Sequence, residues 1–333
     1  MENRLCCLMR PSQNLIITIE VKVKKMKTNK LNTNVTNSLP NRKKSCFIKL
    51  SALILGSVLS HSALAVDVAA GDYTALPAGT NLALAYYQTA SRDELYAGGK
   101  KVDGDFSLAS DVGILRGVHF MDIGGYIVDP QFLLPFGTLD ASKDIAALGE
   151  ESGVGDLILA ATVWLVNKPK DNTYFGITPY VYLPTGTYDN EEGLNLGENR
   201  YKFVLQAGYI TNLTEDISFD LVADVMLYGE NDEFGAEKKT MEQEASFQLQ
   251  AFLRYKMNPA WDFRVGLSQT FGGETEVNGT KMNDAAEVTK MSVGTTYFIS
   301  PSIQLSATYG RDLSVENGFS EDNRLNLRVL KVF

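Results

Sequence analysis

Twelve segments of the chain alternate apolar with polar residues, and this repeat restricts the folds open to it. The segments are 81–89, 106–121, 125–138, 155–166, 173–183, 200–211, 217–229, 243–257, 261–272, 287–299, 302–313 and 323–333. Successive side chains of a β-strand point to opposite faces, so each segment predicts a strand with one apolar face. In the ninth segment, Phe263, Val265 and Leu267 alternate with Arg264 and Gly266. The pattern predicts an all-β fold.

The connections between these segments alternate between short and long. The short ones are 122–124, 167–172, 212–216, 258–260 and 300–301, and the long ones are about 90–105, 139–154, 184–199, 230–242, 273–286 and 314–322. Single-chain bacterial membrane barrels have an even number of strands, short periplasmic turns and longer outer loops. We therefore expect residues 81–333 to form a transmembrane antiparallel β-barrel of about 12 strands. A soluble barrel would show the same alternation, so other features must decide.

Three features favour the membrane barrel. The first is a signal for export, described below. The second is that aromatic residues gather near segment ends, as in membrane-interface girdles: Trp164, Tyr174, Phe175, Tyr209, Trp261, Tyr297 and Phe298. The third is the end of the chain on an alternating segment at Phe333, which resembles the signal read by barrel-assembly machinery. We expect that machinery, outer-membrane lipid and lipopolysaccharide to be partners.

The first 65 residues have the composition of a targeting segment. Basic residues at 42–44 precede an apolar run at 50–59, and Ala63-Leu64-Ala65 is a small-x-small cleavage site. The apolar run is too short to span a bilayer as a helix. We predict that 1–65 is a signal peptide with a mis-called N-terminal extension, and Met26 is a candidate start. Residues 66–80 would be a periplasmic lead-in, too short for a large plug but able to enter the periplasmic mouth.

Composition excludes several function classes. The chain beyond residue 65 holds 20 basic and 38 acidic residues, whereas nucleic-acid binding rewards clustered Lys and Arg. All three cysteines precede residue 66, and His119 is the only histidine after it. We therefore expect no catalytic residues, no metal site, no cofactor and no nucleic-acid partner.

The segment 107–121 fits the barrel least well. Its apolar row contains Leu108, Val112, Ile114, Val118 and Phe120, which would face lipid, but Arg116 lies in the same row. An Arg facing lipid at the bilayer midplane costs about 2–4 kcal/mol. Either a bulge near Gly113 or Gly117 redirects it, or it lies near an interface. On the opposite row, His119 would face the lumen, more plausibly as a hydrogen-bonded histidine than as a catalytic one.

Three motifs resemble the outer-membrane transporter family of the MetA-pathway (meta-pathway) of phenol degradation. They are Gly153-Val154-Gly155-Asp156-Leu157 with Trp164; Tyr180-Val181-Tyr182-Leu183-Pro184-Thr185-Gly186 with Tyr188; and Asn195-Leu196-Gly197-Glu198-Asn199-Arg200-Tyr201. The resemblance covers nearly all of 70–333. It implies one outer-membrane barrel that passes aromatic or other hydrophobic small molecules.

Two groups of residues are candidate sites. Those on polar rows are predicted to line the lumen, either as ion pairs that fill it or as a selectivity lining: Asp220, Asp224, Arg254, Lys256, Asp262, Arg264, Arg324 and Arg328, with His119. The others form a rim loop between two strands, either as turn punctuation or as an inward-folding gate: Pro184, Thr185, Gly186, Asn195, Asn199, Arg200 and Tyr201. The acidic residues of this loop predict solvent exposure in preference to a calcium site.

The sequence therefore predicts an outer-membrane channel for passive uptake of small hydrophobic or aromatic solutes. One alternative is a non-transporting barrel with a structural or surface-interaction role. Another, weaker alternative is an outer-membrane hydrolase that uses His119 with inward carboxylates.

Overall fold

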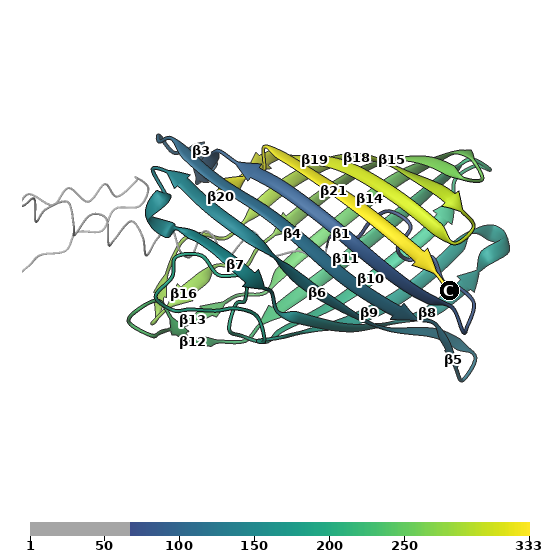
Figure 1. Cartoon of the computed structure of the whole chain (residues 1–333), viewed down its shortest axis with the longest axis horizontal. Coiled ribbons are helices and arrows are strands. Elements are labelled where there is room, and N and C mark those ends of the chain that lie inside the picture. The colour runs from purple at the N-terminus through teal and green to yellow at the C-terminus, as the bar shows by residue number, and fades with distance from the viewer. Residues whose placement is uncertain (1–66) are drawn as a thin grey trace, which may run out of the picture. The chain divides into compact units, whose positions relative to one another are not determined.

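The computed structural model describes residues 67–333. The predicted signal peptide and its extension, residues 1–65, lie outside the described residues and stay predictions. Twelve long strands form the barrel wall (Figure 1). They are β1 (Asn81–Arg92), β4 (Phe106–His119), β6 (Tyr126–Lys143), β8 (Leu157–Lys168), β9 (Thr173–Leu183), β10 (Lys202–Asn212), β11 (Ile217–Tyr228), β14 (Ser246–Asn258), β15 (Trp261–Phe271), β18 (Glu287–Ser300), β19 (Ile303–Val315) and β21 (Asn323–Val332).

The wall closes on itself with antiparallel pairs throughout. Each strand pairs with its neighbours in the chain, β1 pairs with β21, and Tyr86 lies opposite Arg328 at that seam. The pairing of β4 with β6 completes the ring. The predicted twelve-stranded antiparallel barrel is confirmed. Closure leaves no sheet edge in the wall, so the wall's backbone groups are satisfied without water.

The two ends of the barrel differ. Phe333 lies at the end with the short turns (the turn end), whereas short extra strands extend the long connections at the other end (the loop end; Figure 1). The additional elements at the loop end are β2 (Glu94–Ala97), β3 (Lys100–Lys101), β7 (Glu150–Val154), β12 (Asn231–Phe234), β13 (Lys239–Gln243), β16 (Thr275–Val277), β17 (Thr280–Lys281), β20 (Gly318–Ser320) and the 3-10 turn η2 (Ala146–Leu148). At the turn end, the short connections contain β5 (Met121–Ile123) and the 3-10 turn η3 (Pro169–Asp171). The predicted long loops therefore contain two small sheets, β20-β2-β3 and β12-β13-β16-β17.

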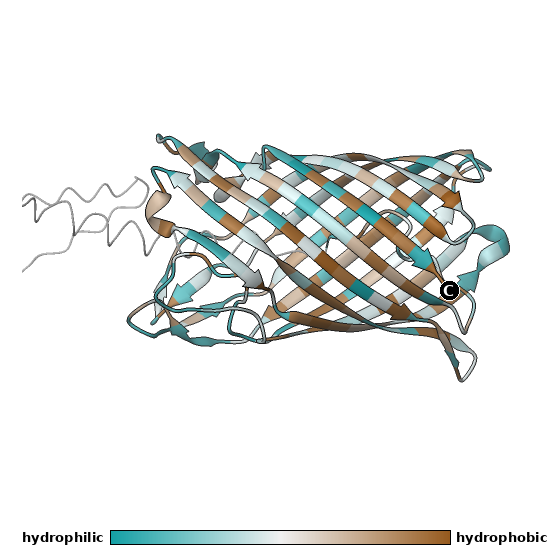
Figure 2. Ribbon diagram, in the orientation of Figure 1, coloured by the Kyte–Doolittle hydropathy of each residue, from teal (hydrophilic) through white to brown (hydrophobic). Residues whose placement is uncertain are grey.

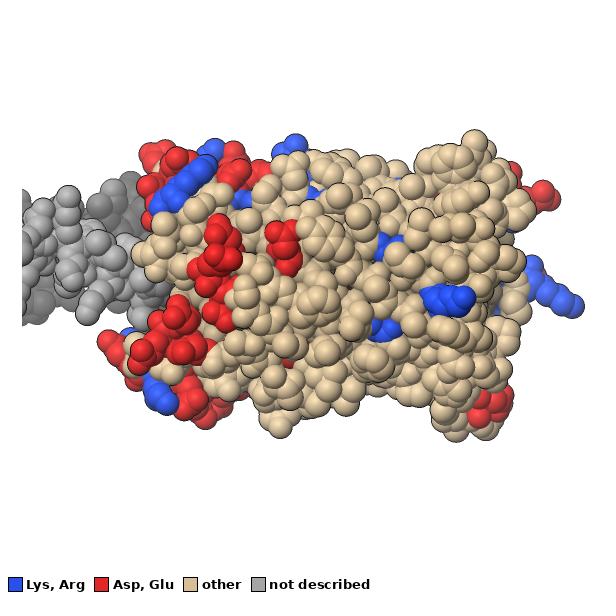
Figure 3. Space-filling view, in the orientation of Figure 1, with Lys and Arg blue, Asp and Glu red and all other residues tan. Residues whose placement is uncertain are grey.

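The outer surface of the wall is apolar. Leu267, Leu205 and Val265 are each more than half exposed, and Figure 2 shows the apolar residues alternating along each strand. Figure 3 shows acidic side chains gathered at the loop end beside a middle zone with few charges. An apolar belt with few charges between charged ends fits a bilayer and would be unfavourable in water. Among residues 67–333, no helix is long and apolar enough to cross a membrane.

Strand β4 corrects the predicted orientation of its two rows. Leu115, on the row predicted to face inward, is 47% exposed, whereas Val118 and Phe120 are buried inside the barrel. The apolar row faces inward because it contacts chain within the lumen, so Arg116 needs neither a bulge nor an interface. The outward row contains Gly113 and Gly117, where an added Cβ would lie 2.5 Å from the rings of Phe136 and Phe132 of β6.

His119 lies on this outward row, so the prediction that it lines the lumen is wrong. Its Nδ1 lies 2.8 Å from Oδ1 of Asn81, at the turn end of β1. No carboxylate of the lumen shares that face of the wall.

The lead-in, residues 67–80, also departs from its predicted periplasmic place. Residues 67–76 run inside the barrel, from Asp67 in its loop-end half to the turn end, where Gly79 N donates to Phe120 O. A tight turn at Ala69–Thr74 fills the middle of the lumen. The lead-in is therefore an internal plug, and residues 67–76 are called the plug below.

The orientation of β4 can be tested by substituting a central outward residue. Leu115→Arg would place a cation in lipid, so unfolding free energy in a bilayer should fall by about 2–4 kcal/mol. Leu115→Ala supplies the control for lost apolar area. A Leu115→Arg cost no greater than that of Leu115→Ala would show that this row does not face lipid.

Candidate functional site

The plug is held at its centre by one carboxylate between two arginines. Asp72 accepts from Nη1 of Arg328 at 2.7 Å and from Nη1 of Arg116 at 3.1 Å. Strands β4 and β21, which carry these arginines, flank β1, and Tyr86 of β1 accepts from Arg116 at 3.2 Å. All three charged side chains are largely buried. A buried ion pair of this kind is costly to break because the remaining charge is left uncompensated.

Three further polar contacts fix the rest of the plug. Gly71 N donates to Asp220 at 2.6 Å, and Arg264 donates to the carbonyl of Ala70 at 2.6 Å. Near the loop end, Asp67 pairs with Arg324 at 3.1 Å. The plug therefore contacts the wall through both its backbone and its charges.

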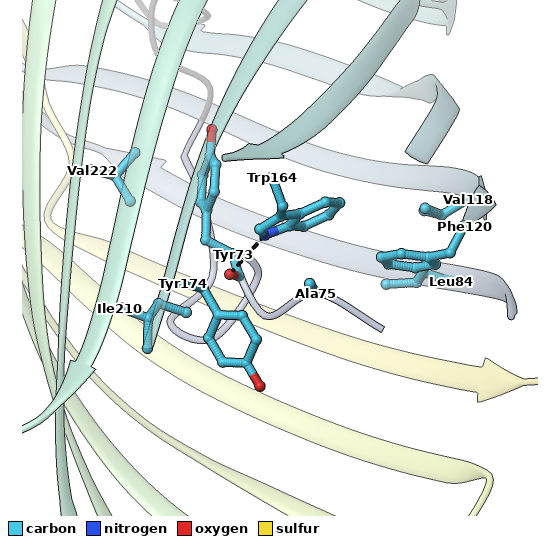
Figure 4. Packing of buried hydrophobic residues seen from close by; sticks show 9 residues of the cluster. All are labelled: Tyr73, Ala75, Leu84, Val118, Phe120, Trp164, Tyr174, Ile210 and Val222. Atoms are coloured by element: carbon cyan, nitrogen blue, oxygen red, sulfur yellow. Dashed lines mark hydrogen bonds between the residues drawn. The ribbon is translucent and has the colours of Figure 1, made fainter. Parts of the chain in front are cut away.

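The other face of the plug packs into an aromatic cluster (Figure 4). Tyr73 lies between Trp164 and the inner faces of β9 and β10, and the indole of Trp164 donates to the carbonyl of Tyr73 at 3.2 Å. Trp164 also stacks on Phe120, with ring centroids 5.5 Å apart. This cluster packs the plug against the inner faces of β8, β9 and β10.

Most of the residues predicted to line the lumen lie inside it and form pairs. Asp220 pairs with Arg254 at 2.8 Å, and Asp262 with Arg264 at 2.7 Å. Asp224 accepts from Gln206 at 3.1 Å. Arg324 and Arg328 bind plug carboxylates, as described above. Lys256 is exposed near the turn end, away from this network.

A cavity of about 740 Å³ occupies the loop-end half of the barrel. One side carries a charged cluster in which Glu321 pairs with Arg92 at 2.5 Å and with Lys290 at 2.6 Å. Its walls also carry apolar side chains, among them Leu139, Leu148, Leu194, Leu196, Phe319 and Met241. This cavity, called the vestibule below, combines apolar and charged walls.

The rim loop, residues 184–201, covers part of the vestibule. Its ends are tied together by Asp156, which accepts from Gly186 N at 3.0 Å and from Glu198 N at 3.1 Å. At its middle, Leu194 is 3% exposed and packs in a cluster with Leu148 and Phe319. Tyr188 and Asn190 also donate to the carbonyls of Glu233 and Gly235, at 3.0 and 3.2 Å. The loop is thus a cover anchored at its base and held by contacts with neighbouring loops.

The base of the rim loop also contains a buried charge cluster. Glu198 accepts from Arg200 at 2.7 Å and from Lys202, and Arg200 lies 4.6 Å from the centre of the Tyr228 ring. Burial alone would raise the pKa of Glu198, but Lys202 and Arg200 outweigh burial and lower it to about 2.

The other predicted rim residues have smaller roles. Asn199 donates to Asn231 at 3.1 Å, and Asn195 bonds to the backbone of Asp189. Thr185 accepts from Leu157 N at 3.1 Å, where β8 begins. Pro184 ends β9 as strand punctuation, whereas Tyr201 is 53% exposed and points away from the cluster.

Sequence reasoning missed the inner row of β9. Tyr174, Gly176, Thr178, Tyr180 and Tyr182 alternate along this strand and are all buried. Their alternation is visible in the sequence. The same pattern, however, is expected for tyrosines buried inside a barrel and for tyrosines at the membrane interface outside it. It also missed Asp72, Arg116 and Glu321, whose roles depend on contacts between distant segments.

No group of three or more His, Cys, Asp or Glu side chains among residues 67–333 is placed to hold a metal ion.

Comparisons with known proteins place the chain among outer-membrane barrels. The family model described as Putative MetA-pathway of phenol degradation matches residues 91–329. The crystal structure of the COG4313 outer membrane channel from Pseudomonas putida F1 is 44% identical, with a TM-score of 0.77, over 80% of this chain and 100% of that chain. The TodX ΔS2S3 mutant monoaromatic hydrocarbon channel is 9% identical over 77% of this chain and 90% of that chain, with a TM-score of 0.45, which supports no transfer of function. A search of curated proteins finds no match.

The central ion pairs of the plug predict a large effect of Asp72→Asn. Two buried guanidinium groups would lose their shared carboxylate, so unfolding free energy should fall by about 3–5 kcal/mol. Loosening of the plug should also raise the single-channel ion conductance. Asp67→Asn is the matched control, since the Asp67 side chain is more exposed and its loss should cost less than about 1 kcal/mol. Equal effects of both variants would contradict the central role of Asp72.

The Glu198 cluster predicts a pH dependence of the rim loop. Because folding lowers the pKa of Glu198, its stabilisation is complete above the unfolded value of about 4.3 and is lost as pH falls toward 2. Hydrogen-exchange protection of residues 184–201 should therefore stay constant from pH 8 to 5. Glu198→Gln should lose this protection already at pH 7. Protection that falls between pH 7 and 5 in the unmodified protein would contradict the prediction.

Proposed function

The chain belongs to the MetA-pathway phenol degradation family of outer-membrane channels, and on that premise we propose that it takes up small hydrophobic or aromatic compounds passively. The observation that carries the proposal is the connection between the vestibule and the inner row of β9. Tyr182 lines the vestibule and Tyr180 follows two residues deeper on the same face. Aromatic rings thus extend from the outer cavity toward the centre of the barrel.

The chemistry of this row suits aromatic solutes. A tyrosine offers a flat apolar ring for stacking, and ring pairs gain about 0.5–1.5 kcal/mol beyond buried area. The apolar side chains of the vestibule would remove a hydrophobic solute from water before it meets these rings. A hydrophilic solute would instead face the charges of the plug and wall, which are already paired with one another.

The plug and the rim loop set the conditions for passage. The plug crosses the lumen between the vestibule and the turn end, so a shift of the plug would widen the path of a solute. The rim loop covers the vestibule through Leu194, so its residues would act as a gate on entry. Passage under this proposal has two controlled steps, one at each end of the vestibule.

The enzymatic alternative loses its geometric basis. His119 lies on the outward row of β4 and bonds to Asn81, so it cannot act with carboxylates inside the barrel. The COG4313 structure, which is 44% identical to this chain, is described as an outer membrane channel.

Export and assembly are part of the same proposal. Residues 1–65 would direct the chain across the inner membrane and be removed. Phe333 is 68% exposed at the end of β21, and its backbone N and O both bond to Asn81. A terminal aromatic ring in this place is open to the barrel-assembly machinery, and the acidic loops at the other end face lipopolysaccharide.

Uptake into proteoliposomes tests the function. Purified protein should accelerate toluene entry over protein-free vesicles, with little effect on a sugar of similar mass. Tyr182→Ala should reduce toluene uptake by roughly 2- to 10-fold through loss of an aromatic contact. Tyr209→Ala, a tyrosine on the outward face of β10, should leave uptake unchanged. A barrel that passes no toluene would favour the non-transporting alternative.

A further inference from the structure

The ring of Tyr73 occupies a slot in the barrel wall that two glycines create. Gly176 of β9 and Gly208 of β10 lie directly opposite each other in the ladder. A Cβ added to Gly208 would lie 2.2 Å from the Tyr73 ring, and one added to Gly176 would lie 3.3 Å from it. Any other residue at 208 would therefore fill the space that the ring takes. The slot is an indentation in the inner wall that has the size of one aromatic ring.

The closed end of the slot recognises a hydroxyl group. The Tyr73 hydroxyl donates to Oε1 of Gln206 at 3.0 Å and lies 2.9 Å from Oγ1 of Thr178. Both wall residues are fully buried. An apolar ring in this place would lose the bond to Oε1 of Gln206 that a phenol hydroxyl makes, so the site would discriminate against analogues that lack the hydroxyl.

The hydroxyl site is fixed by the wall independently of the plug. Gln206 also accepts from Tyr180 at 3.1 Å and donates to Asp224 at 3.1 Å. Thr178 is held by Thr162 of β8 at 3.0 Å. These bonds orient the two groups even when Tyr73 is absent, so the recognition geometry is preorganised.

The slot lies on the same inner row of β9 as the tyrosine that lines the vestibule. Tyr182, Tyr180, Thr178 and Gly176 follow one another on the inner row of β9. Because the hydroxyls of Tyr180 and Tyr73 share Gln206, a ring that passes Tyr180 reaches the slot next.

We propose that this slot is a phenol-binding site of the wall, occupied in the closed barrel by the plug's own Tyr73. A phenolic solute takes the place of Tyr73 when the plug shifts, and its hydroxyl makes the bonds to Gln206 and Thr178. The inference rests on the proposed function and narrows its substrate class to phenols. Tyr73 is then a tethered competitor, so phenol binding and plug release are linked.

Binding to detergent-solubilised protein tests the site without requiring transport. Tyr73→Ala removes the competitor in an otherwise complete barrel, and phenol should bind it at least tenfold more tightly than the unmodified protein. Toluene, which matches the ring but lacks the hydroxyl, should bind Tyr73→Ala at least tenfold more weakly than phenol does. Titration calorimetry measures both ligands.

Two double variants separate this site from an incidental cavity. Tyr73→Ala with Gln206→Leu keeps the space but removes the acceptor, so the preference for phenol should disappear. Tyr73→Ala with Gly208→Leu fills the slot and should bind neither ligand. Should the Gln206→Leu barrel fail to fold, Thr178→Val replaces it with the same expectation. Equal binding of phenol and toluene by Tyr73→Ala, or a phenol preference that survives these changes, would overturn the proposal.

A transport measurement on the barrel with Tyr73 in place completes the test. Phenol entry should saturate and exceed toluene entry, and Gln206→Leu should lower the ratio of phenol to toluene entry. If the barrel passes toluene but Gln206→Leu leaves the ratio of phenol to toluene entry unchanged, the channel function is retained and the phenol site is overturned. A barrel that passes neither solute refutes the proposed function as well, whereas the binding results stand on their own.

Discussion

Closure of the backbone hydrogen-bond ring between β4, β1 and β21 is the constraint on which the rest of the structure depends. Lipid offers no partner to an unpaired N–H or C=O group, so the first and last strands of a membrane-spanning sheet must pair with each other. Closure gives every wall strand one face toward lipid and one toward the lumen, and it fixes which side chains meet inside. Of the three strands at the closure, β4 and β21 carry Arg116 and Arg328, which bind the central carboxylate of the plug, and β1 carries Tyr86, which accepts from Arg116.

Charged side chains inside the barrel form ion pairs with one another, which lowers the cost of placing them within the bilayer. Asp220 with Arg254 and Asp262 with Arg264 neutralise one another across or along neighbouring strands. Arg116 and Arg328 have a plug residue as their shared partner, and the plug arrives from before the first strand. The charges of the barrel wall are thus balanced only when the plug is included, and the wall strands considered alone would leave these two arginines without their shared carboxylate.

The sequence predicted the barrel because alternation and connection length are local properties. Strand number, antiparallel closure and outward rows such as Phe263, Val265 and Leu267 follow directly from them. Strand β4 was misread because its lumen face is as apolar as a lipid face, and only contact with the plug distinguishes them. The same limit hid Asp72 and the roles of Tyr180 and Tyr182. Their partners are distant in sequence, so no local pattern assigns them to the lumen. The anchoring of the rim loop by Asp156 and Leu194 likewise depends on contacts that exist only in the folded loop.

Asp72 and Tyr73 are adjacent residues that bind far-apart sectors of the wall. Asp72 binds β4 and β21, whereas Tyr73 enters between β9 and β10, about half-way around the ring. The turn at Ala69–Thr74 holds both side chains on one short, constrained segment. A displacement that withdraws the Tyr73 ring from its slot therefore also strains the Asp72 ion pairs. Each contact raises the free energy needed to break the other, so the plug should leave both sites together in a cooperative, two-state step. A ligand that occupies only one of the two sites would then favour release of the whole plug. The two contacts break together, so binding at either site shifts the equilibrium between bound and released plug.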